Sequence, residues 1–171
     1  MHGIVILCAT IPIYLTMTFI TTQLAIGTPY YHDAIPLYSE YAVYAIPALL
    51  LFSIAASVVT KPNYDVLCKR LALMYLLKGI AQIITISPQP AGVEQCKDDT
   101  FWTLRACADM MFSGHTAFVY LVLYKCKYRY FITFTMAFEL VMADWHYAVD
   151  CFIAVIVGYA VEKKIIIETY L

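Results

Sequence analysis

Charged side chains are scarce in this sequence. Only 13% of its 171 residues are Asp, Glu, Lys or Arg, whereas 63% are hydrophobic. A soluble domain is about half apolar and about a quarter charged, so this composition predicts an integral membrane protein. The mean hydropathy of +0.74 points the same way. An excess of positive charge is also lacking, since the formal net charge is −1, and we therefore expect no nucleic-acid partner.

Patterns that would hold a metal ion are absent as well. The six cysteines are scattered, and none has a CxxC or CxH spacing, so we expect neither a metal nor another cofactor. The N-terminus "MHG" has no basic region before a short apolar core and a small-residue cleavage pattern, so we expect the first apolar run to be retained as a span. Since no linker or low-complexity segment appears, we expect one membrane-embedded domain over residues 1–171.

Six apolar segments predict an all-α fold, a bundle of six transmembrane helices. A spanning helix needs about 20 mostly apolar residues. The first two segments satisfy this length, and Lys78 interrupts the third. The last three are shorter, so they suit a span only when they pack within a bundle. The expected helices are Ile4–Leu24, Tyr41–Val59, Leu71–Ile86, Phe112–Tyr124, Phe131–Ala143 and Tyr147–Val161.

Basic residues are distributed unevenly between the two sets of loops. If the first helix starts in the cytoplasm, the opposite loops carry only Lys97 and Arg105. The cytoplasmic segments 60–70, 125–130 and the C-terminus carry Lys61, Lys69, Arg70, Lys125, Lys127, Arg129, Lys163 and Lys164. This asymmetry is what the positive-inside rule describes. It predicts that both termini are cytoplasmic and that the fourth and sixth helices start on the exoplasmic or lumenal side.

Two histidines stand at the starts of these two helices, and the topology predicts that they meet in one pocket. His146 and Asp150 are four residues apart, so they share a helical face. A carboxylate there fixes the tautomer of the imidazole and makes its other nitrogen more basic. His115 is a suitable proton donor, and Gly114 and the helix N-terminus let a phosphate approach. This set suits phosphoryl transfer on a lipid headgroup.

Simpler interpretations of the same residues stay open. A histidine at a membrane boundary is often an interfacial polar residue, and a His–Asp pair at this spacing often only caps or solubilises a helix end. Lys78 lies in the middle of the third segment, where a charge costs roughly 2.5–3.5 kcal/mol on insertion scales. It therefore binds substrate or forms a structural ion pair. Trp145 is either an interfacial residue or a cation–π partner for a choline headgroup.

The segments "CADMMFSGHT" (107–116) and "HYAVDCFIAVIVGY" (146–159) resemble the sphingomyelin synthase-like family of membrane phosphotransferases, within the phosphatidic-acid-phosphatase-like superfamily. The family pattern is Cys, Asp, then Phe-Ser-Gly-His-Thr, followed later by His-Tyr-x-x-Asp. A weaker match is "KRLALMYLLKGIAQIITISPQPAGVEQC" (69–96), in which Lys78 replaces the usual Arg. Asp144 and Trp145 stand where animal enzymes often carry His-Glu. The resemblance covers residues 69–160.

The resemblance implies an exoplasmic active site in which His146 attacks the headgroup phosphate and forms a phosphohistidine. Asp150 would orient it. His115 would protonate the departing diacylglycerol oxygen and then activate the hydroxyl of ceramide or a related lipid alcohol. The donor would be a glycerophospholipid that carries phosphocholine or a similar headgroup. The expected substrate-binding residues are Lys78, Asp109, Ser113, Gly114, Asp144, Trp145 and Tyr147.

Two other functions stay open: a lipid phosphate phosphatase that uses water as acceptor, and a non-enzymatic membrane scaffold. Lipid phosphatases of this superfamily carry a Ser-Arg pair before the second histidine, and "FELVMADWH" (138–146) has no arginine. The scaffold is disfavoured because both histidines and the aspartate are present. We expect Cys96 and Cys107 to lie in the same exoplasmic loop. They are either joined in a disulfide or present as two free thiols. The sequence leaves open whether the chain forms a homo-oligomer.

Overall fold

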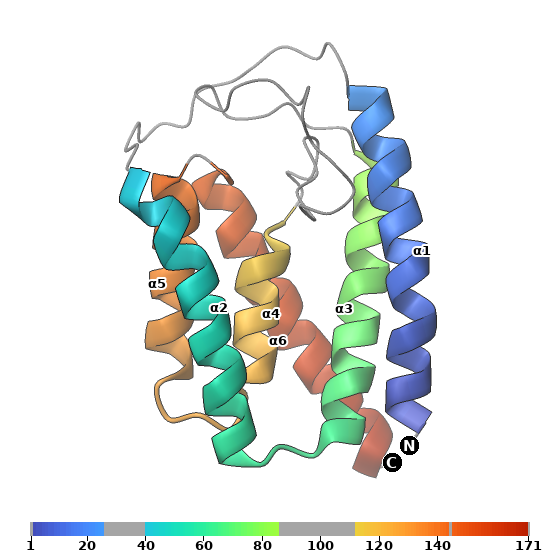
Figure 1. Cartoon of the computed structure of the whole chain (residues 1–171). Coiled ribbons are helices and arrows are strands. Elements are labelled where there is room, and N and C mark those ends of the chain that lie inside the picture. The colour runs from blue at the N-terminus through green and yellow to red at the C-terminus, as the bar shows by residue number, and fades with distance from the viewer. Residues whose placement is uncertain (1, 26–39, 86–111, 144, 171) are drawn as a thin grey trace.

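The structure is a computed structural model that describes residues 2–25, 40–85, 112–143 and 145–170. The described part folds into six α-helices and contains no strand, which confirms the all-α prediction (Figure 1). The helices are α1 (His2–Ala25), α2 (Glu40–Thr60), α3 (Tyr64–Ile84), α4 (Gly114–Val122), α5 (Arg129–Met142) and α6 (Ala148–Tyr170).

Two of the expected helix bounds were wrong. Helix α3 begins at Tyr64 rather than Leu71, because the Asn63 side chain caps it by accepting hydrogen bonds from the first backbone N–H groups. Lys69 and Arg70 therefore lie on a helix and not in a loop. Helix α6 continues past Val161 to Tyr170, since the residues that follow contain neither Gly nor Pro to end it.

Two helices in the described part are long and apolar enough to cross a membrane. They are His2–Ile20 within α1 and Tyr41–Thr60 within α2, with mean hydropathies of 2.1 and 2.2. Only 17% and 22% of these segments are buried inside the structure, so most of their apolar surface faces outward. This finding favours a membrane protein. Helix α4, with nine residues, is about 14 Å long and is shorter than the ~30 Å core of a bilayer.

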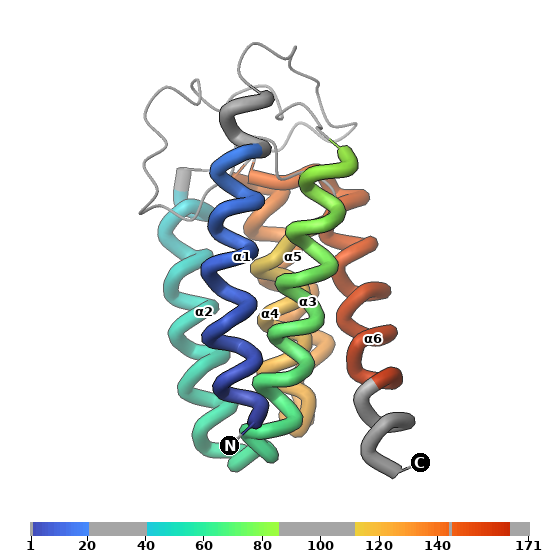
Figure 2. The backbone as a smooth tube through the Cα atoms, turned by 90° about the vertical axis from the view of Figure 1, so that its right-hand side faces the viewer, coloured from blue at the N-terminus to red at the C-terminus, as the bar shows by residue number. Residues whose placement is uncertain are grey.

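The helices run side by side, and α4 occupies the centre of the bundle (Figure 1). It packs against α2, α3, α5 and α6, and its residues Ala117, Val119 and Leu121 are fully buried. Helix α1 packs mainly along α3, and both views show the two next to each other (Figures 1 and 2). The start of α1 and the end of α6 lie at the same end of the bundle (Figure 1).

Two hydrogen bonds fasten α1 to α3. At one end the Gly3 backbone N–H donates to Asp65 Oδ1 at 2.8 Å. Gly3 has no side chain, and a Cβ there would collide with the Asp65 carbonyl, so glycine is what permits this close approach. Towards the other end the Thr18 hydroxyl donates to Gln82 Oε1 at 3.1 Å. The pair α1–α3 thus forms one side of the bundle.

Candidate active site

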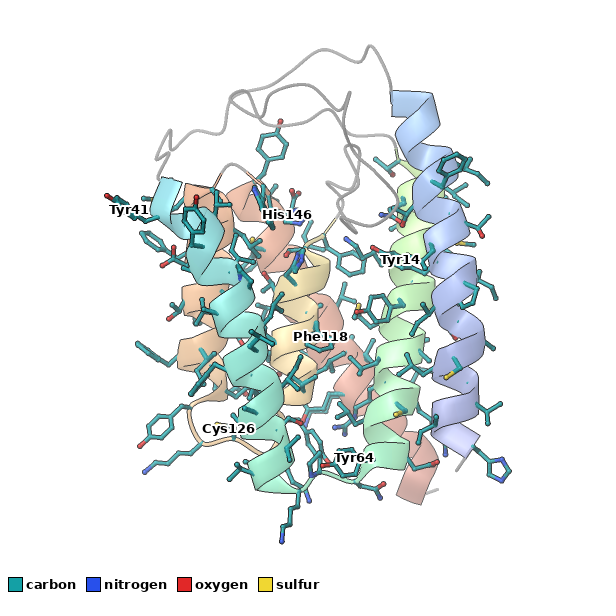
Figure 3. The ribbon with its side chains drawn as sticks, in the orientation of Figure 1. Tyr14, Tyr41, Tyr64, Phe118, Cys126 and His146 are labelled. Carbon is teal, nitrogen blue, oxygen red and sulfur yellow. The ribbon has the colours of Figure 1, made fainter. Side chains whose placement is uncertain are left out.

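The two histidines lie together at the end of the bundle where α4 begins (Figure 3). His115 is in the first turn of α4 and His146 is in the short segment between α5 and α6. Their ring centroids are 6.5 Å apart, with an angle of 65° between the ring planes. The prediction that the two imidazoles meet is confirmed. The two rings are therefore close enough to contact the same small group.

The start of α4 is fixed by Ser113. Its hydroxyl oxygen accepts hydrogen bonds from the Thr116 backbone N–H and from the Thr116 hydroxyl, both at 3.1 Å, which is the usual way for serine to cap a helix. The Ser113 backbone N–H donates to the Asp150 carbonyl oxygen at 3.1 Å. This bond ties the first turn of α4 to the first turn of α6, and therefore holds His115 beside His146.

His146 and Asp150 face each other across one helical turn. His146 Nδ1 is 3.5 Å from Asp150 Oδ2, and the two residues are only 7% and 2% exposed. The distance is that of an ionic contact and is longer than the usual N–H···O hydrogen bond of about 2.7–3.2 Å. The same carboxylate oxygen accepts a 3.0 Å hydrogen bond from the Tyr147 backbone N–H, so Asp150 also caps α6. Because Nδ1 faces the carboxylate, the Nε2 edge of the ring points away from it.

Lys78 brings a buried positive charge from α3 to the start of α4. It is 2% exposed, and its Nζ donates to the Phe112 carbonyl oxygen at 2.6 Å. A Cβ at position 114 would come within 3.0 Å of Lys78 Cε, so Gly114 provides the space that this side chain fills. The lysine therefore lies directly beside the residue that precedes His115 in the chain.

Trp145 belongs to the same site through its contact with His115. The two ring centroids are 6.1 Å apart. The backbone N–H groups of Trp145 and His146 both donate to the Leu140 carbonyl, at 3.0 and 3.4 Å, so both residues are tied to the last turn of α5. Tyr147 is partly buried and contributes its backbone N–H to Asp150.

Four predicted residues lie outside the described part of the chain: Asp109, Asp144, Cys96 and Cys107. Their substrate-binding roles and the disulfide therefore stay predictions. Within the described residues, no group of three His, Cys, Asp or Glu side chains is placed to hold a metal ion.

A cavity of about 330 Å³ lies next to His115, between α1, α2, α3 and α4. This volume is within the usual range for small-molecule sites. Its walls are mainly apolar, and Lys78 and His115 supply the charged and polar groups at one side. The lining residues are Ile11, Tyr14, Leu15, Leu50, Ile54, Tyr75, Lys78, Gly114, His115 and Phe118. Figure 3 shows Tyr14 on α1 and Phe118 on α4 towards the middle of the bundle.

No sequence pattern indicates most of the residues that line this cavity. Tyr14 and Tyr75 pack together with ring centroids 5.1 Å apart, yet each is one of 15 tyrosines in the chain, and nothing near either residue marks it as special. Phe118 lies one helical turn after His115, and that spacing is the one clue that a sequence pattern could have offered.

Comparison of the chain with protein-family models, with curated proteins and with solved structures finds no match.

Proposed function

We propose that the chain is a lipid phosphotransferase, which moves a phosphorylated headgroup such as phosphocholine from a glycerophospholipid to ceramide or a related lipid alcohol. The observation that carries the proposal is the juxtaposition of His115, His146 and Asp150 beside an apolar cavity. A base held by a carboxylate, opposite a second imidazole, is the minimum set for transfer through a covalent intermediate.

In the first step His146 Nε2 attacks the phosphorus atom of the donor lipid. The bond from phosphorus to the diacylglycerol oxygen breaks as the bond to nitrogen forms, and protonated His115 gives its proton to the departing oxygen. Asp150 is 3.5 Å from the other nitrogen of His146, where its negative charge stabilises the imidazolium that develops. The products are diacylglycerol and a phosphohistidine that carries the headgroup.

In the second step His115 works in the reverse direction. Now neutral, it takes the proton from the hydroxyl of the acceptor lipid, and the acceptor oxygen attacks phosphorus. The bond to His146 breaks, and the headgroup leaves on the acceptor. Both enzyme side chains return to their starting protonation states, as a catalytic cycle requires.

Positive charge near the phosphate supports both steps. Lys78 Nζ lies at the segment that starts α4, bound to the Phe112 carbonyl. The N–H groups of the first turn of α4 add the positive end of the helix dipole. Charge that builds on the phosphate oxygens is therefore met by groups that are already in place.

The cavity accommodates the hydrocarbon part of the lipid. Its walls come from four helices and are mainly apolar, and a buried CH₂ group gains about 0.8 kcal/mol over the same group in water. An acyl or alkyl chain in this space would bring the attached phosphate or hydroxyl group to His115. In this proposal all six helices form one membrane-embedded domain, with the histidines on the exoplasmic or lumenal side and both termini in the cytoplasm.

The test is transfer by the purified full chain in proteoliposomes that contain phosphatidylcholine and ceramide, with products identified by mass spectrometry. We expect sphingomyelin and diacylglycerol from the wild type and neither product from His146→Ala. His2→Ala is the matched control, because His2 is exposed at the start of α1, at the end of the bundle opposite the start of α4 (Figure 1), and it should keep full activity. Release of phosphocholine with no sphingomyelin would assign the acceptor role to water. Equal activity of His146→Ala and the wild type would refute the site.

A further inference from the structure

A second cluster of buried charged residues lies at the opposite end of the bundle from the histidines, near Tyr64 and Cys126 in Figure 3. Arg70 of α3 and Arg129 of α5 both contact Glu162 of α6. Arg129 Nη1 is 3.0 Å from Glu162 Oε2, and Arg70 Nη2 is 3.5 Å from the Glu162 backbone carbonyl. We call these three residues, with Tyr120 and Tyr124, the arginine cluster. The Glu162 carboxylate thus pairs with Arg129 and its backbone carbonyl with Arg70, and the three charged side chains together carry a net positive charge.

Arg70 is the member of the arginine cluster that lacks hydrogen-bond partners. It is 2% exposed, and the Tyr124 ring covers one face of its guanidinium, with Cζ 4.6 Å from the ring centroid. Neither Nε nor Nη1 has a hydrogen-bond partner in the described structure, and Nη2 has only the long contact to Glu162. A buried charged group is normally paired and hydrogen-bonded. Two of the three guanidinium nitrogens of Arg70 depart from this rule.

Arg129 provides an internal comparison, because its guanidinium is well supplied with partners. It has the Glu162 carboxylate at 3.0 Å and the Tyr130 hydroxyl at 2.8 Å from Nη2. Its Cζ lies 4.4 Å from the centroid of the Tyr120 ring. The same cluster therefore satisfies one arginine and leaves Nε and Nη1 of the other without a hydrogen-bond partner, although Arg70 is the more buried of the two.

We propose that Arg70 binds the phosphate of an anionic phospholipid at this end of the bundle. A planar guanidinium pairs with phosphate oxygens through two parallel hydrogen bonds. A phosphate also balances the positive charge of the arginine, which a neutral water molecule could not do. Three exposed lysines are close in sequence to members of the cluster: Lys125, Lys127 and Lys163. Basic pockets between membrane helices on the cytoplasmic side are suited to anionic headgroups. The inference rests on the membrane topology of the proposed function and not on the chemistry of the histidines.

The experiment measures lipid binding by the purified full chain in a neutral detergent. Short-chain phosphatidylglycerol is the probe, and short-chain phosphatidylcholine and inorganic phosphate are separate arms. The readouts are the dissociation constant and the rise in melting temperature on binding. Arg70→Gln removes the positive charge and the planar guanidinium group. Lys127→Gln removes one exposed charge from the same end and leaves the arginine cluster intact. Lipid that binds at the histidine site would contribute equally to the measured affinities of both variants, so a difference between them reports on the arginine cluster.

We expect the wild type to bind phosphatidylglycerol about tenfold more tightly than phosphatidylcholine. Arg70→Gln should lose about tenfold in affinity for phosphatidylglycerol, because two charge-assisted hydrogen bonds are removed, whereas Lys127→Gln should stay within about twofold of the wild type. If Arg70→Gln does not fold, Arg70→Lys carries the test. It keeps the charge but cannot form the paired bonds, and its affinity should fall several-fold.

Three results would overturn the proposal. Equal losses in Arg70→Gln and Lys127→Gln would mean diffuse attraction to the surface. An equal rise in melting temperature with inorganic phosphate would assign the site to a soluble anion. A lower melting temperature for Arg70→Gln with unchanged affinity would make Arg70 only a link between helices. His146→Ala should bind phosphatidylglycerol like the wild type, so failure here and failure of the proposed catalysis are distinguishable.

Discussion

At the histidine end of the bundle, backbone groups hold the buried charged side chains, whereas at the opposite end a side-chain ion pair between Arg129 and Glu162 links two helices. Around the histidines, Lys78 donates to the Phe112 carbonyl and Asp150 accepts from the Tyr147 N–H. Groups fixed by the backbone stay in position while a substrate binds and leaves, and this is the preorganisation that transition-state stabilisation requires.

The arginine cluster is built from side chains of different helices. Arg129 and Glu162 join α5 to α6, and Arg70 reaches from α3 to the α6 backbone. The Arg129–Glu162 pair depends on both partners, because removal of one leaves the other as a largely buried unpaired charge. The comparison predicts that mutations at the histidine end reduce the rate with little effect on stability, and that mutations in the arginine cluster do the reverse.

The largest effect should come from Asp150→Asn. The remaining amide oxygen can still accept from the Tyr147 N–H, so α6 should keep its first turn. The negative charge is lost, and the amide NH₂ favours the wrong tautomer of His146. We expect headgroup transfer to slow on the order of 10³–10⁴-fold, with a melting temperature close to that of the wild type. A rate within tenfold of the wild type would show that Asp150 serves only as a helix cap.

His115→Ala should be the next most damaging change. Loss of a general acid–base group reduces the rate by about 10²–10⁴-fold, and the reduction should depend on the leaving group. An activated aryl phosphate ester needs no proton on its departing oxygen, so it should restore part of the activity. The measurement is the ratio of rates for the aryl ester and the natural lipid, which should rise in His115→Ala and stay constant in Asp150→Asn. An unchanged ratio in both variants would exclude His115 as the acid.

Glu162→Gln should lower stability and leave the rate per folded molecule unchanged. Arg129 would lose its carboxylate partner, whereas the contact of Arg70 with the residue 162 backbone carbonyl would stay. Because Arg129 and Glu162 are 12% and 14% exposed, we expect a loss of about 1–3 kcal/mol, below the value for a fully buried pair. Thermal or denaturant unfolding measures it. Lys69→Gln is the control, because it breaks a solvent-exposed pair with Asp65 at 2.9 Å and should cost under about 1 kcal/mol. Equal losses would mean that the arginine cluster does not link the helices.

Two glycine substitutions give the smallest and most direct contrast between the two ends. A Cβ at Gly114 would lie 3.0 Å from Lys78 Cε, so Gly114→Ala should move the amine and reduce transfer several-fold, with little change in stability. A Cβ at Gly158 would lie 2.8 Å from the rigid Tyr120 ring, so Gly158→Ala should cost about 1–3 kcal/mol of stability. The rate per folded molecule should then be unaffected. Activity assays and unfolding curves on both variants check the contrast.

The helical class and the meeting of the histidines could be predicted from sequence, because both depend on features that a linear chain displays. Long apolar runs indicate helices, and alternation of the helices places His115 and His146 at one end. Helix α3 was placed too late, because the expectation followed hydrophobicity and passed over the capping signal of Asn63. The polar residues that follow this cap are helical all the same.

Partners across helices could not be predicted. Helices α1 and α2 are apolar on every side, so nothing in their pattern marks which face carries Tyr14 or Leu50 towards the cavity. Lys78 was singled out as a charge in an apolar segment, but its carbonyl partner at Phe112 depends on how α3 packs against α4. The sharing of Glu162 by two arginines likewise depends on packing between segments that are distant in sequence.

The attachment of α1 to α3 has a consequence for synthesis of the protein. The hydrogen bond from Gly3 to Asp65 joins residues 62 positions apart, so α1 leaves the ribosome well before its partner helix exists. At about 5–20 residues per second this delay lasts roughly 3–12 seconds. During that time the first helix has only lipid or the insertion machinery around its apolar surface. It must therefore be stable alone in the membrane until α3 arrives and docks.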